Sequence, residues 1–214
     1  MNHTELFHLV SAIIVLFIVI GFRDFLELDP TGIGLAVFFA FVLIAVNVVG
    51  KKLMAYQLDA SVHHSVIEFQ RWGFKQHSHF KKPIPLGIIL PLFISIVSLG
   101  VIKFMAVLTY NTTALRRRAA KRFGHMSYTE MTDRHHAYIG AAGVVFTLLS
   151  AIVFYFIPGL EPLARLSAFY AFTNMILFSK SDGMQIFMGS RFLWYSLSVI
   201  TLVFFIYALL LGVF

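Results

Sequence analysis

Residues 172–187 read FTNMILFSKSDGMQIF, a stretch in which Asn174, Lys180 and Asp182 interrupt an otherwise apolar chain. A carboxylate at bilayer depth costs roughly 2.5–3.5 kcal/mol on insertion scales, so an acid in or beside a membrane-spanning segment is typical of a functional position. The alternative is that the chain turns around Gly183 and leaves Asp182 in headgroup water. The surrounding sequence has to decide between these two interpretations.

The composition identifies the broad class of protein. Hydrophobic residues make up 59% of the 214 residues and charged residues only 13%, whereas charged residues are about 25% of an ordinary soluble domain. The mean hydropathy is +0.83. We therefore expect a single polytopic membrane domain over residues 1–214. The chain has no cysteine, which excludes disulfides and thiolate zinc sites.

Six apolar runs approach or exceed the roughly 20 residues that a helix needs to cross a bilayer. They are Leu6–Phe22, Thr31–Gly50, Pro85–Tyr110, Tyr138–Ile157, Leu163–Phe178 and Phe192–Phe214. The first lacks a basic leader and a cleavage site, so we expect it to be a retained span. The third contains Pro85, Pro91 and Lys103, which favours a backbone that folds back at membrane depth.

Basic residues flank this third run on both sides. Lys51–Lys82 and Asn111–His136 each carry six Lys and Arg residues, and cytoplasmic loops are the ones enriched in these residues. A single crossing would place one basic segment on the wrong side. We therefore expect an all-α integral membrane protein with about five transmembrane helices, a re-entrant hairpin, and a cytoplasmic N-terminus in a prokaryotic plasma membrane. Six plain spans are the alternative.

The loops carry two further signals. Ile67 and Phe69 alternate with Glu68 and Gln70, the two-residue period of a half-buried strand, so we expect a short cytoplasmic β element. The run LRRRAAKRFG at residues 115–124 predicts a basic helix that binds anionic lipids at the bilayer surface. This location favours lipid over nucleic acid as the partner.

Three segments together resemble the site-2 proteases, which are intramembrane zinc metalloproteases. NMILFSKSDG is similar to the family signature NLxPxxPLDG, with Asn174, Asp182 and Gly183 matched. HHAYIGAAGVVFTLLSA resembles the family's AAGPxxN helix at 141–143. HFKKPIPLGIILPLFISIVSLG is similar to the β-containing region after the first catalytic helix. The resemblance covers about residues 31–214 and implies a membrane-embedded protease core.

The chain departs from this family where the zinc ligands should be. HExxH places two imidazoles on one helix face to hold zinc and a glutamate to activate water, and this sequence contains no HExxH. Aligning Ala55 with the small residue after the family motif puts Asn47, Val48 and Lys51 in place of His, Glu and His. Val48 cannot move a proton. Other family residues are replaced by Val144, Phe146, Leu177 and Lys180.

Histidines could rebuild a metal site in the loop before the third run. The candidates there are His63, His64, His77 and His79. Two histidines separated by one residue in a strand share a face, a spacing that metals accept. The only carboxylates near them in sequence are Asp59 and Glu68, so a surface or interfacial role is favoured. The same holds for His135 and His136 at the start of the fourth run.

We therefore expect a catalytically inactive relative of the site-2 proteases, without a cofactor, that binds transmembrane segments or another membrane partner. The alternative is an active intramembrane zinc metalloprotease with unusual ligands, such as Asp182 with the loop histidines. A small transporter or a lipid-handling protein is a further alternative.

The same register makes a structural prediction. Loss of zinc would leave Asp182 in a low-dielectric cavity, where a carboxylate needs a proton, water or a cation. We expect Lys51 to pair with Asp182, with Asn47 one turn away on the same helix face adding a hydrogen bond. The alternative is that Lys51 and Lys52 extend into headgroup water.

Overall fold

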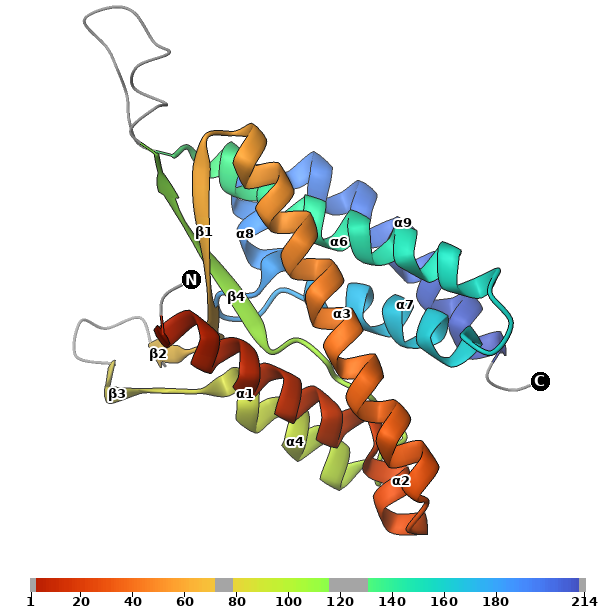
Figure 1. Cartoon of the computed structure of the whole chain (residues 1–214). Coiled ribbons are helices and arrows are strands. Elements are labelled where there is room, and N and C mark those ends of the chain that lie inside the picture. Colours follow the sequence, from red (N-terminus) through yellow and green to blue (C-terminus); the bar gives the residue numbers. More distant parts are fainter. Residues whose placement is uncertain (1–2, 72–78, 116–130, 212–214) are drawn as a thin grey trace, which may run out of the picture.

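The computed structural model describes residues 3–71, 79–115 and 131–211. The helices are α1 (His3–Ile20), α2 (Phe22–Glu27), α3 (Pro30–Gln57), α4 (Leu86–Val97), α6 (Asp133–Tyr155), α7 (Glu161–Met175), α8 (Asp182–Gly189) and α9 (Arg191–Leu211). The strands are β1 (Ala60–Val66), β2 (Phe69–Arg71), β3 (His79–Ile84) and β4 (Leu108–Ala114). In Figure 1, α6, α7 and α9 lie on one side of α3, and α1 and α4 lie on the other, while α8 packs on α6 near β4.

Four of the described helices, α1, α3, α6 and α9, are long and apolar enough to cross a membrane. Large apolar side chains are exposed on them, such as Phe38 and Phe41 on α3 and Val199 and Val203 on α9. Apolar surface of this extent is typical of a face that meets lipid. The helices therefore suggest a membrane protein, as the composition predicts.

The apolar run Leu163–Phe178 forms a shorter helix than the sequence suggests. α7 has 15 residues and ends where Ile176 takes an extended backbone. Much of it is buried, including Leu163 and Tyr170, because it packs between α6 and α9. α7 is therefore below the length of a full span, and it serves as an internal helix that leads into α8.

The third apolar run folds into a closed hairpin. α4 runs beside α1, the chain turns at Ser98–Gly100, and an extended segment returns to β4. Ile67 joins the two ends, because its backbone N–H donates to Val107 and its carbonyl accepts from Gly87. From the sequence, we expect the turn near Pro91 or the stretch Ser95–Ser98. The turn follows Ser98, at the end of that stretch. Pro91 does not form the turn, since it lies buried inside α4, where a proline can bend a helix without ending it.

The β element is larger than the sequence predicts. β1 and β4 pair antiparallel from Ala60 opposite Ala114 to Val66 opposite Leu108, and β2 pairs with β3 in a second sheet. The predicted alternation is confirmed: Ile67 is buried and Glu68 is exposed, although both lie in the gap between β1 and β2. The basic run at 116–124 lies outside the described residues.

In the packed core, α3 lies against α6, and α8 packs on α6. Asp29 caps α3 by accepting hydrogen bonds from the backbone N–H groups of Thr31 and Gly32. Such a cap fixes the start of the helix. Towards its other end, α3 meets α6, which packs in turn on α8. This arrangement brings two segments more than 130 residues apart in the sequence to one buried site.

A candidate polar site between α3 and α8

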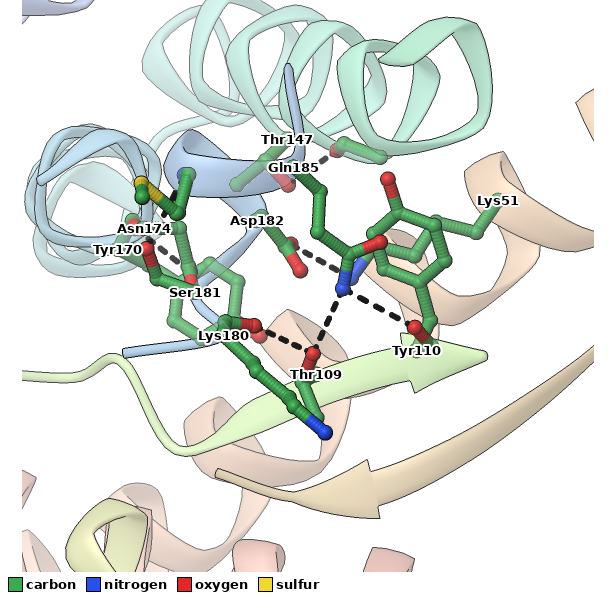
Figure 2. Close-up of polar contacts among 12 residues, drawn as sticks. Lys51, Thr109, Tyr110, Thr147, Tyr170, Asn174, Lys180, Ser181, Asp182 and Gln185 are labelled. Atoms are coloured by element: carbon green, nitrogen blue, oxygen red, sulfur yellow. Dashed lines mark hydrogen bonds and ion pairs between the residues drawn. The ribbon is translucent and has the colours of Figure 1, made fainter. Parts of the chain in front are cut away.

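A buried ion pair joins α3 to α8. Nζ of Lys51 lies 2.6 Å from Oδ2 of Asp182, and each side chain is only 1% exposed. Figure 2 shows the lysine reaching from α3 towards the carboxylate. The pairing expected from the sequence is therefore confirmed, and the alternative of a Lys51 side chain in headgroup water is wrong. Lys52, the next residue, is 40% exposed and points to a different part of the molecule.

The local structure of α3 and α6 explains how a lysine comes to be buried here. Asn47 and Lys51 are four residues apart on α3 and so share one face, and Asn47 is also buried. Gly143 of α6 lies opposite, where an added Cβ would be 2.8 Å from Cε of Lys51 and 3.0 Å from Nδ2 of Asn47. Glycine thus leaves the space that these two side chains fill.

A tight turn before α8 holds Asp182 in position. Ser181 caps the helix, since its hydroxyl accepts from the N–H of Met184 at 3.2 Å and donates to the carbonyl of Ile176 at 2.8 Å. A Cβ on Gly183 would lie 2.4 Å from the Met175 carbonyl oxygen, so the turn needs glycine there. Asp182 therefore begins α8, where the backbone N–H groups favour a negative charge.

Strand β4 closes the site from the sheet side. The Tyr110 ring lies beneath the Lys51 ammonium at 4.9 Å, a cation–π distance, and its hydroxyl donates to the His136 carbonyl at 2.6 Å. Gln185 of α8 donates to the Thr109 hydroxyl and to the Tyr110 carbonyl. Figure 2 shows the two bonds from Gln185. They fix α8 to β4 beside the ion pair.

Several buried polar atoms around the ion pair have no hydrogen-bond partner among the described residues. They are both amide atoms of Asn47, Oδ1 of Asn174 and Oδ1 of Asp182. The expectation that Asn47 adds a hydrogen bond to the ion pair is therefore wrong: its side chain lies beside Lys51 but bonds to neither partner. Asn174 does donate to the carbonyl of Tyr170 at 2.9 Å. A buried polar group without a partner costs about 1–3 kcal/mol, so a cluster of them marks a polar site with capacity for further hydrogen bonds.

The residues at this site do not fit the zinc ion that the family resemblance implies. Val48 offers no polar atom, and Lys51 brings a positive charge to the side of the Asp182 carboxylate where a dication would bind. Within residues 3–71, 79–115 and 131–211, no group of three or more His, Cys, Asp or Glu residues could hold a metal ion. Of the family-matched residues, Asn174 lies in the last turn of α7, and Asp182 and Gly183 lie in the first turn of α8.

The other positions compared with the family lie in the packing of α6 or in the turn before α8. Ala141 and Gly143 are buried on α6. Val144 is buried in the core that α6 forms with α8 and α9, and Phe146 packs against Gly50 of α3. Leu177 and Lys180, in the places of the family prolines, lie in the turn before α8 with Leu177 exposed. These substitutions therefore leave the meeting of α3 and α6 intact.

The loop histidines do not meet Asp182 in any described contact. His63 and His64 lie on β1 against Glu5 of α1, at 3.7 Å and 3.3 Å from its carboxylate oxygens. His77 and the side chain of His79 lie outside the described residues. Glu5, which is far from these histidines in the sequence, is thus a further carboxylate beside them, because α1 packs against β1.

Glu5 forms the centre of a second polar cluster that sequence reasoning missed. Its carboxylate is only 4% exposed, and it lies 3.3 Å from Nζ of Lys52. Burial lowers the pKa of His64 to about 3, and the positive charge of Lys51 adds to this effect against the opposing influence of Glu5. His64 is therefore neutral near pH 7. A carboxylate in the first turn of an apolar helix was the available signal, since such residues are rare.

The other two histidines interact near the start of α6. Thr112 of β4 lies 2.8 Å from Nδ1 of His136, and Thr132 lies within hydrogen-bond distance of His135. His136 thus connects α6 to β4, and the His135 contact lies within the start of α6 itself. Their expected place at a membrane interface stays untested.

Comparisons with family models, with curated proteins and with solved structures found no match to this chain. The function is therefore argued from the site itself.

Proposed function

We propose that this chain is a catalytically inactive relative of the site-2 proteases, with a Lys51–Asp182 ion pair in the position of the zinc ion, and that it binds transmembrane segments. The observation that carries this proposal is the buried 2.6 Å pair between α3 and α8. It supports the alignment in which Asn47, Val48 and Lys51 stand where the protease motif would be. It also gives a physical reason why the acid is kept when the metal ligands are absent.

The order of the surrounding elements supports the same proposal. α3, the β element, the α4 hairpin, α6 and the turn into α8 follow one another as the matching segments of the family do. Full spans for α1, α3, α6 and α9, with α4 as a re-entrant hairpin, are part of the proposal. Both basic segments would then lie on one side of the membrane, as the distribution of Lys and Arg favours.

A groove between α7 and α9 offers a place for a transmembrane segment. It measures about 430 Å³, and apolar side chains such as Met175, Ile176 and Trp194 line it. The Ser198 hydroxyl lines the groove and has no partner among the described residues. Small and hydroxyl-bearing residues at such a surface favour packing of a helix in the bilayer. Asn174, next to Met175, connects this groove to the polar site.

Reinstating the motif tests the proposal directly. We expect the wild-type protein, purified without added chelator, to carry no stoichiometric zinc. The triple variant Asn47→His, Val48→Glu, Lys51→His should gain about one zinc per chain, because both imidazoles would then face Asp182. Adding Asp182→Ala to the triple variant is the matched control and should remove that zinc. Elemental analysis of the folded, detergent-solubilised proteins gives the readout.

The outcomes separate the proposed function from its alternative. Stoichiometric zinc in the wild type that is lost in Asp182→Ala would overturn the proposal of a catalytically inactive protein. It would favour a metalloprotease with unusual ligands. A triple variant that folds but takes up no zinc would overturn the alignment of Asn47, Val48 and Lys51 with the motif.

Binding of transmembrane segments has its own readout. The chain has two tryptophans, so Trp72→Phe leaves Trp194 as the reporter in the groove. A single-span peptide that carries a fluorescence quencher should quench Trp194 saturably in bilayer discs. Ser198→Phe, which fills the groove, should abolish this effect. Quenching that is equal in both proteins would mean that the groove is not the binding surface.

A further inference from the structure

A second set of charged residues lines a cavity at the end of the bundle where α2 joins α1 to α3. The cavity measures about 490 Å³, within the range of small-molecule sites. Its walls come from the end of α1, the N-terminal halves of α3 and α7, the end of α9 and the segment that follows α4. In Figure 1 this end lies far from β1 and from α8. The cavity is thus separate from the Lys51–Asp182 site.

Positive charge exceeds negative charge in this cavity. Arg23, Lys103 and Arg165 line it together with a single acid, Asp24. Within the described part of the chain, none of these four side chains forms an ion pair. Nε of Arg165 is buried and has no hydrogen-bond partner there. A buried N–H without an acceptor is costly, so the Arg165 guanidinium has the capacity to donate to an added acceptor.

The rest of the cavity wall is apolar. Leu35, Phe39 and Phe169 contribute to it. A second cavity of about 310 Å³ shares Arg165 and Ala208 with the first. It lies between α6, α7 and α9, and most of its lining is apolar, with residues such as Phe204, although the acid Glu161 also contributes. Arg165 therefore stands between a positively charged chamber and a hydrocarbon-lined one.

We propose that these joined cavities bind an amphiphile with a phosphate headgroup. The phosphate oxygens would lie between Arg23, Lys103 and Arg165, and the hydrocarbon chain would follow the apolar cavity along α9. A guanidinium donates in pairs to phosphate oxygens, which is why arginine is favoured at such sites. The same chemistry would accept free phosphate, but the adjoining apolar chamber favours a lipid.

The test uses the full chain in detergent micelles and counts bound lipid by native mass spectrometry. Phosphatidylglycerol should bind more tightly than phosphatidylcholine with the same acyl chains. Arg165→Gln should weaken phosphatidylglycerol binding by about tenfold, the effect expected when a hydrogen bond to a charged group is lost. Arg134→Gln is the matched control, since Arg134 is an exposed arginine at the opposite end of the bundle. This variant should bind phosphatidylglycerol as the wild type does.

Two further arms complete the test. Inorganic phosphate that displaces the lipid from the wild type, but has no effect in Arg165→Gln, supports the phosphate site and identifies free phosphate as a second ligand. If Arg165→Gln does not fold, Lys103→Gln and Arg165→Lys provide the same comparison, each with weakened binding expected. Equal phosphatidylglycerol binding by the Arg165 and Lys103 variants and by Arg134→Gln would overturn the proposal, as would equal affinity for phosphatidylcholine.

Discussion

Gly143 lies directly against Lys51, so that a Cβ atom added to the glycine would be 2.8 Å from Cε and 2.9 Å from Cγ of the lysine. The buried ion pair therefore depends on a residue of α6 that makes no polar contact with it. Because Gly143 has no side chain, α3 can approach α6 closely enough for Lys51 to reach Asp182.

Gly143→Ala should destabilise the protein by about 1–3 kcal/mol, the usual cost of overpacking a filled core. Gly34→Ala is the matched control, because an added Cβ there meets nothing within 4 Å. Since alanine favours helix over glycine, that control should be neutral or stabilising by up to about 1 kcal/mol. Thermal unfolding in detergent measures both effects. The cost of Gly143→Ala should fall in a Lys51→Ala, Asp182→Ala background; if the whole cost persists, the Asn47 side chain at 3.0 Å rather than Lys51 sets the limit.

Replacing one member of the ion pair should cost much more than replacing both. Lys51→Met or Asp182→Ala alone should each destabilise the protein by about 3–5 kcal/mol, because each leaves an unpaired buried charge. The double variant should recover most of that loss, since desolvation cancels much of the attraction in the intact pair. Denaturation of the four proteins gives the coupling energy.

The neighbouring lysine provides a matched cycle. Lys52 is partly exposed and pairs with Glu5 rather than with Asp182. Lys52→Met and Asp182→Ala should therefore give additive losses, with the lysine contributing about 1 kcal/mol or less. Additive losses in the Lys51 cycle as well would contradict a direct interaction between Lys51 and Asp182.

The ion pair could be predicted from sequence because the resemblance to the site-2 proteases implies a register for Lys51, and local geometry and the cost of buried charge then favour a pair with Asp182. Positions 47 and 51 share a helix face in any α-helix, and an isolated acid in an apolar environment needs a cation. The Glu5 cluster could not be predicted in the same way. Glu5 and His64 are 59 residues apart, and only the packing of α1 against β1 brings them together.

The same contrast holds for the fold: features set by a single segment could be predicted, and features set by contacts between segments could not. Apolar runs of sufficient length identify α1, α3, α6 and α9, since spanning length and hydropathy are properties of one segment. The length of α7 depends on the turn that follows it. Ser181 closes this turn by donating to the Ile176 carbonyl, and Gly183, at the start of α8, lies directly against Met175. That turn is stabilised by contacts with α7 and β4, which hydropathy does not report.

His64 should make stability depend on pH. Its folded-state pKa is about 3, lowered chiefly by burial, and its unfolded value is about 6.5. The unfolded chain therefore binds the extra proton between these values, so stability is complete above about pH 6.5 and falls as the pH drops towards 3. The groups that face the ring are Glu5 of α1 and Lys51 and Lys52 of α3.

Chemical denaturation across this pH range tests the role of His64. His64→Gln should reduce the slope by up to about 1.4 kcal/mol per pH unit, the effect of one proton. His63→Gln, which removes the half-exposed imidazole beside it, is the control and should retain the wild-type slope. Equal slopes in the wild type and His64→Gln would show that other groups carry the pH dependence.

A disulfide between β1 and β4 can test both the strand register and the topology of the α4 hairpin. The hydroxyl oxygens of Ser61 and Thr113 lie 2.6 Å apart at paired positions, and the chain has no cysteine of its own. Ser61→Cys, Thr113→Cys should therefore oxidise readily, since its Cβ atoms are within the range of a disulfide. Ser61→Cys, Asn111→Cys is the matched control, because Asn111 lies on the same face two residues along. Diagonal neighbours of this kind are about 7–8 Å apart, so the control variant should oxidise slowly.

The measurement is a mobility shift in intact membranes, with thiol labelling from each side. Because β1 precedes α4 and β4 follows it, a disulfide in the first variant requires both flanks to lie on one side of the membrane. Cysteines at 61 and 113 that stay reduced and label from opposite sides would mean that the α4 segment crosses the membrane.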